Sequence, residues 1–348
     1  MQRFSYRLSR GVTEIILGTG AISSLGELED ALVLFPESLE DLVKSHIHGS
    51  AEYIGISDGE ESKTMETVIQ VLDKLMVGNF KRNSMLISFG GGTVSDVAGF
   101  AASIYLRGIR YISVPTTLLS MVDASMGGKN GVNFRGVKNV LGTFYSPSEI
   151  IIDTSLIREM PKFLIEDGIG EIAKYAAILD IELQEFLMNN SVNEILEDGE
   201  KTEYLLTRCV KDKMDLVEQD EFDQKGIRAV LNYGHTIGHA IEALSGFSIS
   251  HGRAVIGGML METDYAVSKG LVTPDVRKRI GELVTHLGFS VKREDYLPGP
   301  PEELIQYILS DKKSTRHTLK LPIPEKPGIP KVCEVELSSI SDYLGLLK

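Results

Sequence analysis

Short apolar runs alternate with longer stretches of helical spacing through the first half of the chain. The runs are rich in β-branched residues and bounded by Gly, Ser or Pro, as strands usually are. They lie at 13–18, 52–57, 84–92, 110–117 and 149–155. Stretches of helical spacing lie between several of them, at 62–77 and 93–106. Strands that alternate with helices usually form a mostly parallel sheet covered by helices, so this half predicts an α/β domain.

The pattern changes after about residue 155, where apolar residues recur at helical spacing and β-branched runs become few. Pro147 and Pro161 flank the change and place a domain boundary between about 147 and 160. We therefore predict two domains, an α/β domain at 1–155 and an all-α domain at 156–348. The Pro-rich segment 321–331 predicts an irregular crossing near the end of the helical domain.

Composition narrows the class of protein. The 348 residues are 43% hydrophobic and carry a formal net charge of −13, which argues against binding to nucleic acid or to an anionic membrane. No run of about 18 apolar residues occurs, and the first residues lack a signal-peptide core, so we expect a soluble, cytoplasmic protein. Cys209 and Cys333 are far apart, which excludes a cysteine-cluster metal site and suits a reducing compartment.

A glycine-rich turn follows one of the predicted strands. In "MLISFGGGTVSDV" the chain passes from a strand through Gly90, Gly91 and Gly92 into a helix, whose free amides could hold a diphosphate. Such a turn also serves ordinary strand–helix packing. The acidic residue of a standard dinucleotide fingerprint follows the glycines, whereas the better candidate here, Asp58, precedes them. A dinucleotide site would thus be a variant of the usual topology.

A second segment, 114–142, combines many hydrogen-bonding side chains with five glycines. Its polar residues are Thr116, Thr117, Asp123, Lys129, Asn133, Lys138 and Asn139. This composition favours ligand contact over a simple surface loop, although a turn-rich connection is the alternative. Arg107 lies just upstream.

Three histidines and one carboxylate are candidates for chemistry in the second half. His235 and His239 are four residues apart and share a helical face, and His251 follows after a turn. With Glu171 they could form a three-ligand metal site, or they could make core hydrogen bonds. Glu171 and Lys174, three residues apart, form either a modest ion pair or a buried functional one.

Several blocks together resemble the 3-dehydroquinate synthase family. They are "DGEESK", "GGGTVSDVAGFAAS", "PTTLLSMVDASMGGKNGVN", "GEIAKY", "LNYGHTIGHAIE" with "HGRAV", and "DKKSTRHTLKLP". Departures from the usual pattern are Ser57, Asn130, "GEIAKYA" and one extra residue near "EFDQKGIR", and none removes a matched ligand or charge. The resemblance implies a homodimer in which an N-terminal domain, here 1–155, binds NAD and a helical C-terminal domain, here 156–348, binds a metal and the substrate.

The same resemblance implies the site residues. Zinc, which cobalt can replace in such a set, would be held by Glu171, His235 and His251. NAD would be held by Asp58, Gly59, Glu60, Glu61, Ser62, Lys63, Gly91, Gly92, Thr93, Val94, Ser95, Asp96, Thr116, Thr117, Lys129, Lys138, Leu156, Ile157, Arg158 and Glu159. The substrate would contact Asp123, Lys129, Asn139, Glu171, Lys174, Lys213, Arg228, Asn232, His239 and Lys312, with Arg107 reaching the site of the partner subunit.

The reaction that the resemblance implies converts 3-deoxy-D-arabino-heptulosonate 7-phosphate, a sugar-acid phosphate, into 3-dehydroquinate and phosphate. It runs through transient oxidation by NAD, phosphate elimination, reduction, ring opening and aldol closure, and so belongs to the carbon–oxygen lyases. Three alternatives stay open: a cyclase acting on sedoheptulose 7-phosphate, a polyol dehydrogenase of the glycerol dehydrogenase kind, and a non-catalytic NAD-binding regulator.

Overall fold

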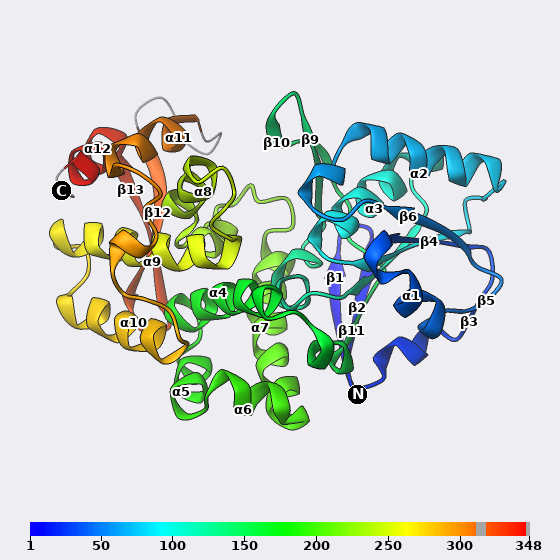
Figure 1. Cartoon of the computed structure of the whole chain (residues 1–348), viewed down its shortest axis with the longest axis horizontal. Coiled ribbons are helices and arrows are strands. Elements are labelled where there is room, and N and C mark those ends of the chain that lie inside the picture. Colours follow the sequence, from blue (N-terminus) through cyan, green and yellow to red (C-terminus); the bar gives the residue numbers. More distant parts are fainter. Residues whose placement is uncertain (311–317, 346–348) are drawn as a thin grey trace. The chain divides into compact units, whose positions relative to one another are not determined.

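The computed structural model describes residues 1–310 and 318–345, and the chain divides into two compact units (Figure 1). The first unit comprises Met1–Pro161 and Gly199–Phe222, and the second comprises Lys162–Asp198 and Asp223–Lys348. Residues 199–222 therefore belong to the first unit, whereas the sequence pattern grouped them with the helices of 156–348.

A seven-stranded sheet forms the centre of the first unit. Its strand order is β1 (Gln2–Leu8), β2 (Gly11–Gly18), β11 (Glu149–Asp153), β8 (Arg110–Pro115), β7 (Met85–Gly90), β4 (Ala31–Pro36) and β6 (Glu52–Ile56). β1 pairs antiparallel with β2, and the other neighbouring strands of this sheet are parallel. The prediction of a mostly parallel α/β domain is confirmed, with β1 and β4 as strands that the pattern did not predict.

Helices cover both faces of this sheet because its central strands are apolar on both sides. In β4, Leu32 and Leu34 pack with residues of α2 (Met65–Val77) and α3 (Gly92–Ile104). Val33 and Phe35 point to the opposite face and pack with residues of η1 (Ala21–Leu25) and α1 (Glu40–His46). Strands buried on both faces read as continuous apolar runs rather than alternating ones. Shorter elements complete this part: η2 (Glu37–Leu39), β3 (Glu27–Leu28), β5 (His48–Gly49), η3 (Glu60–Ser62) and η4 (Tyr105–Arg107).

The polar segment 114–142 holds a short helical turn and most of a β-hairpin. One π-helical turn, η5 (Ser120–Ala124), precedes the strands β9 (Lys129–Phe134) and β10 (Val137–Phe144). Arg135 and Gly136 join the strands with φ of 49° and 78°. Two positive φ angles in a two-residue loop match the twist of a hairpin.

α7 (Gly199–Gln219) packs on the first unit against β1, β2 and η5, and against η6 (Thr154–Glu159). Its buried apolar side chains include Leu206, Val210 and Met214. Helical spacing predicts such a face but not which core will cover it. This packing is the reason that 199–222 joins the first unit.

The second unit is built around α9 (His251–Ser268), which packs against α4 (Lys162–Ile178), α8 (His235–Leu244) and α10 (Pro274–His286). α9 is apolar on nearly every side and mostly buried, as expected for a helix in the centre of a unit. The other helices among the described residues of this unit are α5 (Ile181–Asn189), α6 (Val192–Glu197), η7 (Ile227–Asn232), η8 (Arg293–Asp295), η9 (Pro301–Glu303), α11 (Leu304–Ser310) and α12 (Leu337–Gly345). The helical character of this part is confirmed.

The prediction that this part is all-α is wrong in one place. β12 (Thr318–Lys326) and β13 (Ile329–Glu336) form an antiparallel pair through the Pro-rich segment, which the sequence pattern predicted to be irregular. Pro322 and Pro324 are two residues apart, so their backbone nitrogens face the same edge of β12. Proline is tolerated in a strand where no ladder hydrogen bond is lost.

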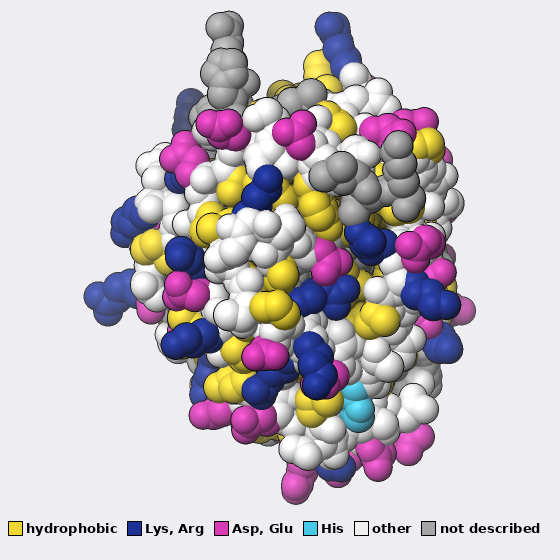
Figure 2. All heavy atoms as spheres, turned by 90° about the vertical axis from the view of Figure 1, so that its left-hand side faces the viewer, with side chains coloured by type: hydrophobic (Ala, Val, Ile, Leu, Met, Phe, Trp, Pro, Cys, Tyr) yellow, Lys and Arg dark blue, Asp and Glu magenta, His cyan; other side chains and the backbone are white. Residues whose placement is uncertain are grey.

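The surface of the second unit carries both signs of charge. Figure 2 shows the face on which α10 and α12 lie, where basic and acidic side chains intermingle and form no large patch of one sign. Among the described residues, no helix combines the length and the apolar character needed to cross a membrane.

Candidate functional site

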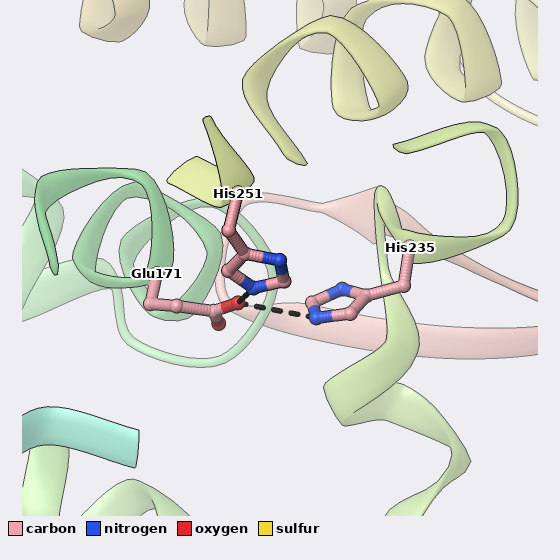
Figure 3. A group of neighbouring side chains, drawn as sticks. All are labelled: Glu171, His235 and His251. Atoms are coloured by element: carbon pink, nitrogen blue, oxygen red, sulfur yellow. Dashed lines mark hydrogen bonds and ion pairs between the residues drawn. The ribbon is translucent and has the colours of Figure 1, made fainter. Parts of the chain in front are cut away.

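Three side chains from three helices of the second unit converge (Figure 3). Glu171 lies on α4, and His235 and His251 are the first residues of α8 and α9. Oε1 of Glu171 is 3.1 Å from Nε2 of His235 and 3.0 Å from Nε2 of His251. The three ligand atoms lie within 4.8 Å of one another. A carboxylate and two imidazoles in this arrangement fit a three-ligand metal site that keeps a position for substrate.

In His235 and His251 the other ring nitrogen, Nδ1, also has a hydrogen-bond partner. Nδ1 of His235 is 3.1 Å from the carbonyl oxygen of Tyr233, and Nδ1 of His251 is 3.3 Å from Oε2 of Glu242. A carbonyl and a carboxylate accept hydrogen bonds, so each Nδ1 is the donor. When only Nδ1 carries a proton, Nε2 presents a lone pair toward the cluster, which is the usual arrangement around metal-ligating histidines.

Glycines let α4 and α9 approach closely beside two of these ligands. A Cβ added to Gly170 would lie 2.4 Å from Cα of Gly252, and one added to Gly252 would lie 2.5 Å from the backbone oxygen of Asp167. The backbone N–H of Gly252 also donates to Oδ1 of Asp167 at 2.9 Å. Because Gly170 precedes Glu171 and Gly252 follows His251, this backbone contact sets the distance between the two ligands.

α8 begins against α9 in a similarly tight contact. Gly234, its N-cap, has φ of 78° and no side-chain cap, and a Cβ on Gly258 would lie 1.9 Å from the Gly234 oxygen. Glu262 of α9 supplies the missing cap: its carboxylate accepts the N–H of Gly234 at 2.8 Å and of Ile237 at 3.0 Å. Glu262 is 1% exposed. It fixes the start of α8, where His235 lies.

Charges around Glu171 favour its ionised form. Burial has the largest effect and would raise its pKa, but Lys174 and His235 together hold the pKa of Glu171 well below its ordinary value. Lys174 forms an ion pair with the other oxygen, Oε2, and both side chains are buried. Of the two alternatives that the sequence left open for Glu171 and Lys174, the structure therefore has the buried ion pair.

The pKa values of the two histidines shift in opposite directions. Burial lowers the pKa of His235 below its ordinary value, against the opposing effect of Glu171. Burial would also lower the pKa of His251, yet Glu171 and Glu242 raise it to about 10. Without a metal, His251 is protonated and bridges two carboxylates.

His239 shares the face of His235 but not its surroundings. Its side chain is exposed, and its ring centre lies 5.2 Å from that of His235 and 6.2 Å from that of His251. His239, Glu242 and His251 also form a group whose ligand atoms lie within 4.8 Å. The cluster around buried Glu171 is the stronger metal candidate. In the second group, Nδ1 of His251 already donates a hydrogen bond to Glu242 and is therefore not available as a metal ligand.

The first unit gathers most of the predicted cofactor residues at one edge of its seven-stranded sheet, whereas Lys129 and Lys138 lie on the β9–β10 hairpin. Residues 58–63 follow β6, 91–96 follow β7, Thr116 and Thr117 follow β8, and 156–159 follow β11. Carboxyl ends of parallel strands form the usual binding edge of α/β sheets. Asp58 accepts the N–H of Ser38 at 3.2 Å there.

The start of α3 is suited to an anion. Its N-cap is Gly91, which makes no side-chain cap, and uncapped first-turn amides with the helix dipole attract phosphate groups. A Cβ on Gly91 would lie 3.2 Å from Thr117, so this turn leaves little room for a side chain. Together with the sheet edge, these features fit a dinucleotide.

Two ion pairs in the first unit join residues predicted from different motifs. Lys63 pairs with Asp96, whose pKa is raised to about 6 because burial outweighs the opposing effect of Lys63. Nζ of Lys213 on α7 lies 2.9 Å from Oδ1 and 2.8 Å from the backbone oxygen of Asp123 on η5. The pair unites two of the predicted substrate residues, despite the extra residue in the spacing that follows Lys213.

The other predicted substrate residues are spread over loops and helix ends. Arg107 is exposed at the end of η4 with φ of 67°, Lys129 begins β9, and Asn139 lies in β10 with φ of 50°. Buried Arg228 and half-buried Asn232 lie on η7, immediately before α8. Two of the predicted NAD contacts are also exposed, Lys138 on β10 and Arg158 on η6. Lys312 lies outside the described residues.

Sequence reasoning missed Glu242 and Glu262, and it left Asn133 without a role. Each glutamate stands in an apolar stretch of a helix, "GHAIEAL" and "GGMLMETDYA". A carboxylate in such a stretch is the available signal, because buried acids need hydrogen-bond partners. The signal does not identify the partner.

The family models that match this chain and two of its relatives are all of one kind. Residues 53–166 match the family described as 3-dehydroquinate synthase N-terminal, and 168–314 match its C-terminal counterpart. A 3-dehydroquinate synthase of Sulfolobus acidocaldarius is 39% identical over 347 residues, which cover 99% of this chain and 98% of that relative. One from Saccharolobus solfataricus is also 39% identical, over 335 residues and 94% of each chain.

Solved structures share the fold. A 2-deoxy-scyllo-inosose synthase in complex with carbaglucose-6-phosphate, NAD+ and Co2+ has a TM-score of 0.87, with 23% identity and 99% of each chain covered. A 2-epi-5-epi-valiolone synthase from Streptomyces hygroscopicus with NAD+ and Zn2+ has a TM-score of 0.83, with 24% identity and 99% and 97% covered.

Proposed function

The chain belongs to the 3-dehydroquinate synthase family, and from that premise we propose that it converts 3-deoxy-D-arabino-heptulosonate 7-phosphate into 3-dehydroquinate and phosphate. This is a carbon–oxygen lyase reaction without net oxidation. The observation that carries the proposal is the convergence of Glu171, His235 and His251 in the second unit, with Lys174 paired to the same carboxylate.

Glu171, His235 and His251 are the proposed ligands of one divalent metal ion, zinc or cobalt. The ion would supply Lewis-acid polarisation of substrate hydroxyl groups. The chain prepares the donors for it: Lys174 keeps Glu171 ionised, and the partners at Nδ1 leave Nε2 of each histidine available.

The first unit is the proposed NAD-binding part. NAD would supply a hydride acceptor that is regenerated in each turnover. The diphosphate would lie at the uncapped start of α3, and the segments after β6, β8 and β11 would hold the rest of the nucleotide. The Lys63–Asp96 pair beside this edge would orient Lys63.

A net acidic protein must place positive charge locally to bind a substrate that carries both carboxylate and phosphate. Lys174, Lys213 and Arg228 are buried cations suited to these anionic groups. His239, exposed one turn after His235, would donate to the phosphate. The remaining proposed contacts are Asp123, Lys129, Asn139, Asn232 and Lys312.

The chain would act mainly by positioning and by charge stabilisation. We propose that the phosphate group of the substrate takes up the proton in its own elimination, which accounts for a site rich in cations whose acidic residues are engaged in pairs. We also propose a cytoplasmic homodimer in which Arg107 contacts the site of the partner subunit.

The test measures phosphate release from two sugar phosphates, and NADH formation with glycerol, by the purified, metal-loaded protein with NAD+. Release from the heptulosonate phosphate, without accumulation of NADH, is expected. Faster release from sedoheptulose 7-phosphate would replace the proposal with another cyclase. NADH accumulation with glycerol, without phosphate release from the heptulosonate phosphate, would replace it with a dehydrogenase.

Two variants test the division of roles between neighbouring histidines. His235→Ala should lose bound zinc, because it removes a ligand atom 3.1 Å from Glu171. His239→Ala should keep zinc but turn over slowly. Unchanged zinc content in His235→Ala would show that the ligand assignment is wrong.

A further inference from the structure

Asn133 joins three segments of the first unit through its side chain and backbone. It lies in β9 next to the hairpin turn, and its backbone N–H donates to the oxygen of Lys63 at 2.9 Å. Its Nδ2 donates to Oε1 of Glu60 at 2.9 Å, and its Oδ1 accepts the backbone N–H of Asn139 at 3.0 Å. One amide therefore bridges η3 and β10.

The contact with β10 falls at a break in the hairpin ladder. Val137 pairs with Phe134, whereas Leu141 pairs with Val132, so residues 138–140 all lie opposite Asn133. A bulge leaves backbone groups without ladder partners, and the side chain of Asn133 takes one of them. Asn139 has φ of 50° there, a conformation that asparagine tolerates better than most residues.

The contact with η3 extends to the glycine-rich turn. Oε2 of Glu60 accepts the hydroxyl of Thr93, in the first turn of α3, at 3.3 Å. Residues 138–140 are thus tied through Asn133 and Glu60 to the start of α3. The two ends of this chain of hydrogen bonds are proposed NAD contacts and a proposed substrate contact, and Asn133 itself has neither role.

We propose that Asn133 is a positioning residue that couples the dinucleotide site to the bulge of residues 138–140, so that bound NAD+ holds Asn139 in place for the substrate. The inference rests on the proposed function for what binds at each end. A ligand that orders Glu60 and Thr93 stabilises the hydrogen bonds of Asn133 and hence the bulge. By thermodynamic reciprocity, substrate at Asn139 tightens NAD+ binding by the same factor.

Two substitutions separate the two hydrogen bonds. Asn133→Ala removes both. Asn133→Asp keeps an oxygen to accept the N–H of Asn139 but has no N–H for Glu60, and its charge repels that carboxylate. Val137→Thr, an exposed change of similar size in the same hairpin, is the matched control.

Amide hydrogen exchange of residues 137–141 in the full-length protein is the primary readout, with and without NAD+. In wild type and Val137→Thr, NAD+ should slow exchange of this segment several-fold. Asn133→Ala should exchange faster than wild type even without NAD+, by about 2–10-fold if one neutral hydrogen bond is lost. Asn133→Asp should match wild type without NAD+ and fail to respond when NAD+ is added.

Steady-state kinetics give the second readout. Asn133→Ala should raise KM for the heptulosonate phosphate by about 2–10-fold with a smaller change in kcat, because the residue orders a binding group and touches no reacting atom. Exchange in Asn133→Ala equal to wild type, or a normal NAD+ response in Asn133→Asp, would overturn the coupling.

The outcomes also distinguish this inference from the proposed function. If wild type releases phosphate from the heptulosonate phosphate but Asn133→Ala exchanges like wild type, the coupling fails and the proposed function stands. If wild type releases none but the exchange pattern holds with NAD+, the proposed substrate fails and the coupling stands.

Discussion

Replacing Glu262 by glutamine tests whether a buried carboxylate outside the metal cluster holds that cluster together. The side chain is 1% exposed and accepts two backbone N–H groups, of Gly234 and Ile237, at the start of α8. Glutamine keeps the shape but replaces one oxygen by an NH2 group, which donates rather than accepts. One buried N–H of α8 is then left facing a donor.

The expected cost follows from these two contacts. An unsatisfied buried N–H costs about 1–3 kcal/mol, and a carboxylate at a helix N-terminus in a partly buried site contributes up to about 2 kcal/mol that a neutral amide does not recover. Together Glu262→Gln should lose about 2–4 kcal/mol. For a unit of this size that corresponds to a Tm lower by roughly 5–15 °C.

The effect should also reach the metal, because His235 is the first residue of the helix that Glu262 caps. We expect zinc affinity to fall about 10–100-fold, the range typical of residues that orient ligands. Calorimetry of the metal-free protein and chelator competition for zinc measure the two effects. Glu282→Gln, an exposed change on α10, is the control. If Glu262→Gln matches Glu282→Gln in both Tm and zinc affinity, the capping role is refuted.

Three further predictions concern protons, backbone contact and substrate binding. The pKa of His251 is about 10 without metal, so zinc must displace a proton from this residue when it binds. Apparent zinc affinity, measured by chelator competition, should therefore rise about tenfold per pH unit from pH 7 to 9. An affinity that does not change with pH would contradict this. The same raised pKa stabilises the metal-free fold fully below 6.5, and this contribution disappears as the pH rises through 10. Gly252→Ala places a methyl group 2.5 Å from a backbone oxygen of α4 and should lower the free energy of unfolding by about 1–3 kcal/mol. Because Gly252 follows the ligand His251, zinc affinity should fall at least about tenfold. The control Gly199→Ala, in open space, should leave both unchanged. Lys213→Met removes the partner of Asp123 and should lower kcat/KM about 10–150-fold, which corresponds to the loss of one hydrogen bond to a charged group. NAD+ affinity, measured by titration, should stay unchanged. A kcat/KM equal to that of the wild-type protein would show that Lys213 does not belong to the site.

Local pattern was sufficient for much of the first unit. The runs at 84–92 and 110–117 became β7 and β8, and the glycines between strand and helix lie where the sequence predicts them. β4 was missed because a short apolar run without alternation does not distinguish strand from helix. The β9–β10 hairpin was missed because its turn is Arg135–Gly136 rather than a more typical Asn–Gly.

The candidate metal cluster could be predicted only in part. Histidine spacing pointed to His235, His239 and His251, and the family resemblance selected two of them with Glu171. That selection remains a prediction, which the geometry of the three side chains supports. Spacing could not reveal Glu262 or Glu242, because their partners come from other helices. Hydrogen bonds between elements depend on packing that no local pattern encodes.

The path of the chain has a consequence for how the protein is made. The polypeptide leaves the first unit at residue 161, returns at 199 and leaves again at 222. On the ribosome the strands β1 and β2 emerge first, but the helix that covers them, α7, emerges only after α4, α5 and α6 have been synthesised. The nascent first unit must therefore wait with an apolar surface uncovered while part of its neighbour is translated, and neither unit could be exchanged between genes as one uninterrupted coding segment.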